Sequence, residues 1–121
     1  MTFAPQAVDW QARAKALQPR NQLFIDGRFV PALSGATFDC ISPIDGKVIA
    51  QVAAGDAPDI ALAVVSGRAA FNRGDWSRAA PKHRKQVLLR FAELLRANRD
   101  ELALTETLDM GKPIADSLAV D

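Results

Sequence analysis

The sequence has one cysteine, Cys40, and one histidine, His83, among its 121 residues. A single cysteine excludes an internal disulfide, and these two side chains together cannot supply the ligands of a structural zinc site. The chain also lacks the G-x-G-x-x-G, Walker A, H-E-x-x-H and C-x-x-C motifs, so the common phosphate-binding and metal-binding signatures are missing. Sparse cysteine use is typical of a reducing compartment, and we expect a cytoplasmic protein.

An excess of charge of one sign and long apolar runs are lacking as well. The 15 basic and 14 acidic residues leave a formal net charge of +1, so whole-chain electrostatics gives no reason to expect a nucleic acid or an anionic membrane as partner. No apolar run approaches the ~18 residues that span a bilayer. Residues 1–6 also lack the basic patch and apolar core of a signal peptide. We therefore expect neither a nucleic-acid partner nor a membrane partner.

The apolar content, in contrast, is sufficient for a core. Hydrophobic residues make up 49% of the chain and charged residues 24%, which is not the composition of a disordered protein. A length of 121 residues allows one domain at most.

Local patterns in the first quarter predict a short helix and a β-hairpin. The helix is expected over residues 8–17, which are rich in alanine. Leu23–Ile25 and Arg28–Val30 then flank the pair Asp26-Gly27, which suits the positive φ angles of a type I′ turn. The hairpin is the strongest local signal in this region.

A second hairpin is expected directly afterwards. Thr37–Ile41 and Val48–Val52 are rich in β-forming residues, and the loop Ser42–Lys47 between them contains proline and an Asp-Gly pair. Isolated two-stranded hairpins are marginal in water, so these four strands need a face to pack on.

From Asp56 the sequence changes to the period of amphipathic helices. The first of these helices ends at Gly74, and Pro81 opens the second. The third ends at Gly111, which can take a left-handed conformation, and a fourth is expected over 114–120. The order is therefore a short helix, two β-hairpins and three to four helices, without the strand–helix–strand alternation of a parallel nucleotide-binding sheet.

The chemistry-bearing side chains leave few candidates for catalysis. Cys40 and His83 could in principle form a thiol–imidazole pair. Cys40, however, falls in a predicted strand, where free cysteine usually acts as a small buried hydrophobe. His83 lies in the basic run Lys82–Lys85, which favours a solvated helix face. We predict no catalytic residue in this chain.

Two charged groups leave alternatives open. The run Lys82–Lys85 could mark a basic DNA-binding helix, but acidic residues from Glu93 onward interrupt any basic stripe. Glu106 and Asp109 are three residues apart on one helix face, which suits either paired carboxylates for a cation or an exposed polar face.

Four motifs together are similar to a known family. They are Phe24-Ile25-Asp26-Gly27, Ser42-Pro43 with Asp45-Gly46, Ala69-Ala70-Phe71 with Trp76, and Glu106-Thr107-Leu108-Asp109-Met110-Gly111-Lys112-Pro113. In order and spacing, residues 21–121 resemble the N-terminal quarter of the NAD(P)-dependent aldehyde dehydrogenases, an α/β family. The segments 73–77 and 105–117 look most like the bacterial γ-glutamyl-γ-aminobutyraldehyde dehydrogenases.

The resemblance implies oxidation of a small-molecule aldehyde to a carboxylic acid with NAD or NADP, by thiol attack, hydride transfer and thioester hydrolysis. In the family the catalytic and cofactor-binding residues lie beyond the part that this chain resembles, and Cys40 does not match the motif of the nucleophile. We therefore expect residues 1–20 to be a helical arm and residues 21–121 an incomplete cofactor-binding domain, inactive alone and part of a homo-oligomer at full length. The alternative is a stand-alone interaction module that pairs with a full-length dehydrogenase subunit.

Two further site predictions depend on the resemblance. Some family members bind a structural cation at a threonine, the next carbonyl and an aspartate. Here Cys40 replaces the threonine, which leaves the Ile41 carbonyl and the Asp109 carboxylate as metal ligands. The helix from Ile114 resembles one that lines the substrate entrance, so Leu118 and Val120 are predicted wall residues.

Overall fold

The computed structural model describes residues 8–119 and places five helices and two separate two-stranded antiparallel sheets within them. In chain order the elements are α1 (Trp10–Ala16), β1 (Leu23–Ile25), β2 (Arg28–Val30), β3 (Thr37–Ile41), β4 (Val48–Ala53), α2 (Ala57–Arg73), α3 (Pro81–Ala97), α4 (Arg99–Met110) and α5 (Ile114–Ala119). This order confirms the predicted one, with four helices after the hairpins. None of the helices in the described part is long and apolar enough to cross a membrane.

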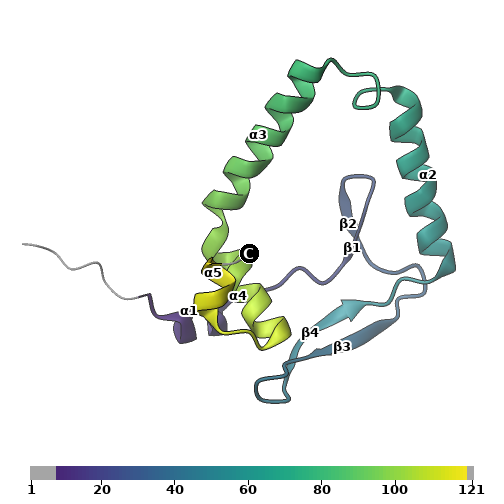
Figure 1. The fold of residues 1–121 in the computed structure, drawn as a ribbon. Helices are drawn as coiled ribbons and strands as arrows, with labels where there is room; N and C mark the ends of the chain where they lie inside the picture. The colour runs from purple at the N-terminus through teal and green to yellow at the C-terminus, as the bar shows by residue number, and fades with distance from the viewer. Residues whose placement is uncertain (1–7, 120–121) are drawn as a thin grey trace, which may run out of the picture.

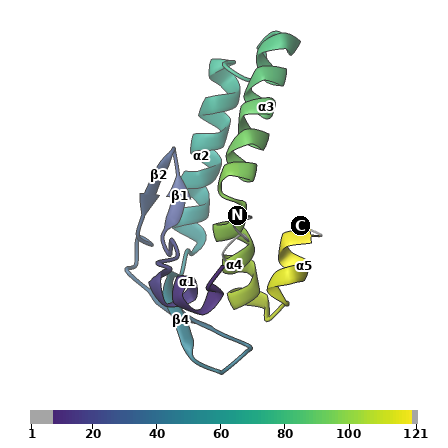
Figure 2. The same ribbon diagram turned by 90° about the vertical axis from the view of Figure 1, so that its left-hand side faces the viewer.

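The helices form two regions that differ in packing. Figure 1 shows α2 and α3 as the two long arms of an open arch, which we call the arch. At its base lie α1, α4, α5 and the β3–β4 hairpin, which we call the α4 cluster, and Figure 2 shows the same grouping from the side. Within this cluster α4 contacts both α1 and α5.

The first hairpin has the predicted turn. Leu23 pairs with Val30 and Ile25 with Arg28, so Asp26 and Gly27 alone form the connection. Their φ angles are 52° and 74°, and a type I′ turn requires positive values at both positions.

The second hairpin is irregular where it approaches α4. Cys40 pairs with Ala50, but Ile41 pairs with Val48, so Ile49 is the extra residue of a β-bulge in β4. Bulges bend and twist a strand locally. The bulge therefore lies beside the position at which the Cys40 side chain reaches α4.

A buried carboxylate fixes the start of α2. Asp59, which is 3% exposed, accepts the backbone N–H of Asp56 at 3.0 Å in a capping box. Its other oxygen accepts the backbone N–H of Leu33, also at 3.0 Å. One side chain thus joins the arch to the loop that follows the first hairpin, and α2 ends at Gly74 with a φ of 86°.

The core is small for the length of the chain. The buried apolar side chains of the described residues are Ala32, Ala53, Ala103 and Leu104. A compact monomer of 13.1 kDa would expose roughly 6,400 Å², whereas this chain exposes 9627 Å². Exposed apolar side chains of the arch contribute to this excess, and they include Ile60, Val64, Val65, Phe71, Leu88, Phe91 and Leu95.

Candidate functional site

The α4 cluster brings the single thiol of the chain to a carboxylate. Cys40 on β3 donates its S–H to Asp109 Oδ1 on α4, with 3.2 Å between sulfur and oxygen. This hydrogen bond, desolvation and the charge of Asp109 all raise the pKa of the Cys40 thiol. Because the thiolate is the nucleophile, a thiol held in its protonated form is poorly suited to covalent catalysis.

Cys40 is partly buried, so the prediction of a simple buried hydrophobe captures only part of its environment. The sequence interpretation missed its hydrogen bond to Asp109, which joins residues 69 positions apart. The family resemblance was the one available signal, because it assigned both positions to the same cation site.

The thiol–imidazole alternative finds no contact in this structure. His83 lies on α3, where it lines a groove with Gln86, Val87, Arg90, Phe91 and Leu94. No hydrogen bond among the described residues joins it to Cys40. The groove is apolar and belongs to the arch, away from the thiol–carboxylate pair.

The predicted cation ligands can be tested against the chemistry of the donors. Ca²⁺ takes 6–8 oxygen ligands, and here Asp109 Oδ1 already accepts the thiol of Cys40. The described residues contain no group of three or more His, Cys, Asp or Glu side chains that could hold a metal ion. These residues alone therefore do not fit a hard cation, and the site at Ile41 and Asp109 stays a prediction.

A pocket of about 410 Å³ opens beside the thiol. Its walls come from the segment after α1, from the β3–β4 hairpin and from α4, and they comprise Leu17, Pro19, Arg20, Cys40, Ile49, Ala50, Val52, Leu102, Thr105, Glu106, Leu108, Asp109 and Met110. Glu106 is paired with Lys112 at 3.4 Å, and both side chains are about a quarter exposed. The pocket is thus mostly apolar, with its polar groups already paired on one side.

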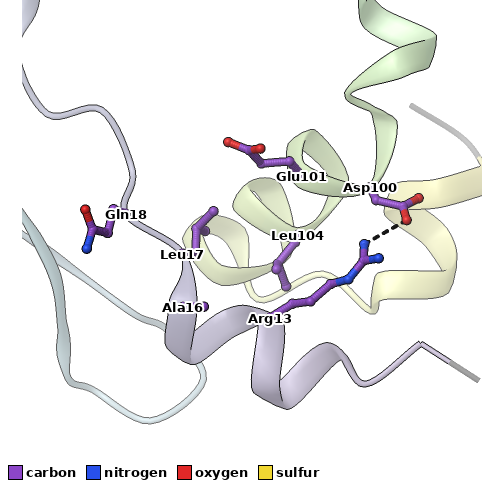
Figure 3. Close-up of a pocket in the computed structure, with 7 residues that line it drawn as sticks. All are labelled: Arg13, Ala16, Leu17, Gln18, Asp100, Glu101 and Leu104. Carbon is purple, nitrogen blue, oxygen red and sulfur yellow. Dashed lines mark hydrogen bonds and ion pairs between the residues drawn. The ribbon is translucent and has the colours of Figure 1, made fainter.

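The arm reaches α4 through one arginine. Arg13 Nη1 lies 2.8 Å from Asp100 Oδ2, and Figure 3 shows the guanidinium pointing at that carboxylate. The central carbon of this guanidinium group lies 5.4 Å from the centroid of the Trp10 ring. Leu17 and Leu104 line the adjoining pocket. These contacts place α1 on the surface of α4.

One of the two predicted entrance residues lies in the described part. Leu118 is partly buried on α5, and its carbonyl accepts a hydrogen bond from Arg99 Nη2 at 2.6 Å. It lines a pocket between α3, α4 and α5. Val120 lies outside the described residues. A role for either in substrate entry stays a prediction.

Comparison with known proteins shows what the sequence and fold are similar to. A family model described as "Aldehyde dehydrogenase family" matches residues 29–121. NADP/NAD-dependent aldehyde dehydrogenase PuuC of Escherichia coli is 44% identical over 112 residues, which cover 93% of this chain and 23% of that protein. Aminoacetaldehyde dehydrogenase of Pseudomonas aeruginosa is 45% identical over 121 residues, which cover 100% of this chain and 24% of that protein.

Solved structures agree with the sequence comparison. An apo indole-3-acetaldehyde dehydrogenase superposes with a TM-score of 0.91 at 57% identity, covering 93% of this chain and 26% of that one. The γ-glutamyl-γ-aminobutyraldehyde dehydrogenase of Burkholderia cenocepacia gives a TM-score of 0.92 at 50% identity, covering 93% and 23%. Both confirm the predicted α/β fold class, and the chain spans about a quarter of the length of these relatives.

Proposed function

Because the chain belongs to the aldehyde dehydrogenase family, we propose that it serves as the first part of an enzyme that oxidises an aldehyde to a carboxylic acid. The cofactor of the family is NAD+ or NADP+, and indole-3-acetaldehyde dehydrogenase has been solved with NAD+. The observation that carries the proposal is that nearly the whole of this chain matches about a quarter of the length of much longer enzymes of the family. The relatives act on different aldehydes by name, so the substrate is proposed only as a small-molecule aldehyde.

In this proposal, residues 21–121 contribute the first part of the cofactor-binding domain and residues 1–20 form an arm. The contact of Arg13 with Asp100 supports the assignment of the arm, because it attaches α1 to α4 from outside the segment 29–121 that matches the family model. The complete enzyme would be a cytoplasmic homo-oligomer with no nucleic-acid partner. Some relatives are mitochondrial by name, so the compartment is a separate question from the chemistry.

The arch supports a role as one portion of a larger body. The chain exposes roughly 3,200 Å² more than a compact monomer of its size, several times the ~800 Å² that each partner buries in a standard interface. Both α2 and α3 carry large apolar side chains that are exposed. Further polypeptide of the same enzyme would cover these faces and complete the core.

The chain alone is proposed to be inactive. Its one thiol is hydrogen-bonded to Asp109 and its one imidazole lies on another helix, so no described side chain is placed to form and resolve a thioester. The test is NADH formation by the purified chain with NAD+, NADP+ and a panel of aldehydes, with an intact family enzyme as positive control. Turnover that disappears in Cys40→Ala would overturn this proposal.

The unpartnered arch also favours a second candidate function, a stand-alone module that pairs with a full-length dehydrogenase subunit. The two functions differ in the stability expected for the isolated chain. A portion of a larger domain should unfold without a single cooperative transition, whereas an independent module should unfold cooperatively. Calorimetry distinguishes them, and a sharp transition with equal calorimetric and van't Hoff enthalpies would favour the module.

A further inference from the structure

The thiol of Cys40 stands at the place where the family resemblance implies a cation. In some members of the family that the chain resembles, a threonine, the next carbonyl and an aspartate bind the ion. In this chain the side chain at the first position is a thiol, and its sulfur lies 3.2 Å from Asp109 Oδ1. The oxygen that a cation would use therefore already accepts a proton donor.

The chemistry of the two occupants is different. A hard cation selects oxygen ligands and gains little from a protonated thiol. A thiol, in contrast, is a weak hydrogen-bond donor that satisfies a carboxylate without supplying a full positive charge. A cation bound to Oδ1 would compete with the thiol for that oxygen.

We propose that in this chain the Cys40 thiol takes the place of a cation at Asp109 and ties the β3–β4 hairpin to α4. The proposal concerns a contact inside the α4 cluster and does not depend on aldehyde oxidation. It assigns Asp109 a structural role that needs no metal ion.

The contacts around Cys40 and Asp109 support their role in holding the β3–β4 hairpin against α4. Within residues 8–119, Cys40 to Asp109 is the one side-chain hydrogen bond that joins the β3–β4 hairpin to α4. Immediately beyond both elements, a Cβ added at Gly111 would lie 3.0 Å from Cγ of Pro43. The end of β3 and the end of α4 thus meet closely at two neighbouring points, and glycine at position 111 permits the second.

The test is the rate at which N-ethylmaleimide labels Cys40 in the 121-residue chain at one fixed pH. In this reaction the sulfur forms a bond to an alkene carbon of the maleimide, and a proton is taken up by the neighbouring carbon, so no oxidant is needed. We expect labelling to be at least about tenfold slower than in the same chain in urea, because the hydrogen bond to a charged group must open first. Asp109→Asn should recover most of that difference, whereas Asp116→Asn, which removes an exposed carboxylate of α5, should not.

The decisive measurement uses the unmodified chain and therefore does not depend on the folding of a variant. Labelling is repeated with sodium, potassium, magnesium or calcium chloride replacing choline chloride at constant ionic strength. The proposal predicts rates that agree within about twofold in all these salts. A cation that binds Oδ1 of Asp109 would release the thiol, so acceleration by one of these ions in the native chain but not in Asp109→Asn would overturn the proposal. Labelling as fast as in urea would also overturn it, and neither result would bear on the proposed dehydrogenase function.

Discussion

The α4 cluster and the arch both contain amphipathic helices, but among the described helices only α4 has buried apolar side chains. In α4, Ala103 and Leu104 are buried, and Ser117 of α5 is buried beside them. In the arch, α3 has no buried residue and α2 has only the capping Asp59. The difference shows where this chain packs on itself and where its apolar side chains stay exposed within the described residues.

The polar contacts differ between the α4 cluster and α3. The α4 cluster contains Cys40 to Asp109, Arg13 to Asp100, and Thr107 Oγ1 to Ser117 Oγ at 3.0 Å. These pairs connect different elements of the cluster. In α3, Arg90 to Glu93 is an ion pair within one helix at 3.0 Å, and such a pair does not position one element against another.

The largest expected effect is a cavity in the α4 cluster. Leu104→Ala should lower the free energy of opening of α4 by about 3 kcal/mol, because Leu104 is 4% exposed and its packing would be lost. The matched control, Leu88→Ala at a 57% exposed position on α3, should cost less than about 0.5 kcal/mol. Hydrogen exchange of the α4 amides measures both. Equal effects of the two substitutions would remove the distinction between cluster and arch.

A smaller effect is expected where the arch meets the first hairpin. Asp59→Ala would leave the backbone N–H groups of Leu33 and Asp56 without their acceptor and should cost about 2 kcal/mol. The readout is exchange at these two amides when the sequence continues into a complete aldehyde dehydrogenase polypeptide. Asp75→Ala, at an exposed carboxylate after α2, is the control and should leave them unchanged.

The arm should respond more weakly. Arg13→Ala removes an ion pair whose side chains are about half exposed, so the loss should stay below about 1 kcal/mol and shrink with added salt. Proteolysis within residues 8–20 should become faster while exchange in α5 stays constant. A loss that salt does not reduce would mean that Trp10 and the arginine stem contribute more than the charge.

The smallest effect concerns pH. Hydrogen bonds from Lys47 lower the pKa of Asp45 in the β3–β4 turn, where the two charged groups are 3.0 Å apart. A pKa that is lower in the folded state stabilises the turn above the unfolded pKa, and the contribution disappears as pH falls through the lowered value. Lys47→Gln should shift the NMR-detected pKa of Asp45 back toward its usual value. An unchanged pKa would show that the backbone N–H of residue 47 is sufficient.

Local chemistry predicted most of the fold. The turn at Asp26-Gly27, the start of α3 at Pro81 and the ends of α2 and α4 at Gly74 and Gly111 follow from backbone preferences that act over a few residues. The same signals do not report which helix faces which.

The candidate site was less predictable from the sequence. Arg13 and Asp100 are 87 residues apart and show no local pattern, so only the folded chain brings them together. Cys40 and Asp109 were both assigned to the cation site that the resemblance implies, but their direct hydrogen bond was not predicted. The open arch could not be derived either, because amphipathic periodicity gives the apolar face of a helix but not whether anything covers it.

Hydrogen–deuterium exchange, compared between the two regions, measures directly whether the α4 cluster is folded while the arch is open. In the isolated chain the amides of α4 and α5 should be protected, whereas those of α2 and α3 should exchange at rates close to an unfolded peptide. When the same sequence continues into a complete aldehyde dehydrogenase polypeptide, both regions should be protected and the protein should form NADH with an aldehyde. Equal protection of α2, α3 and α4 in the isolated chain would contradict the account.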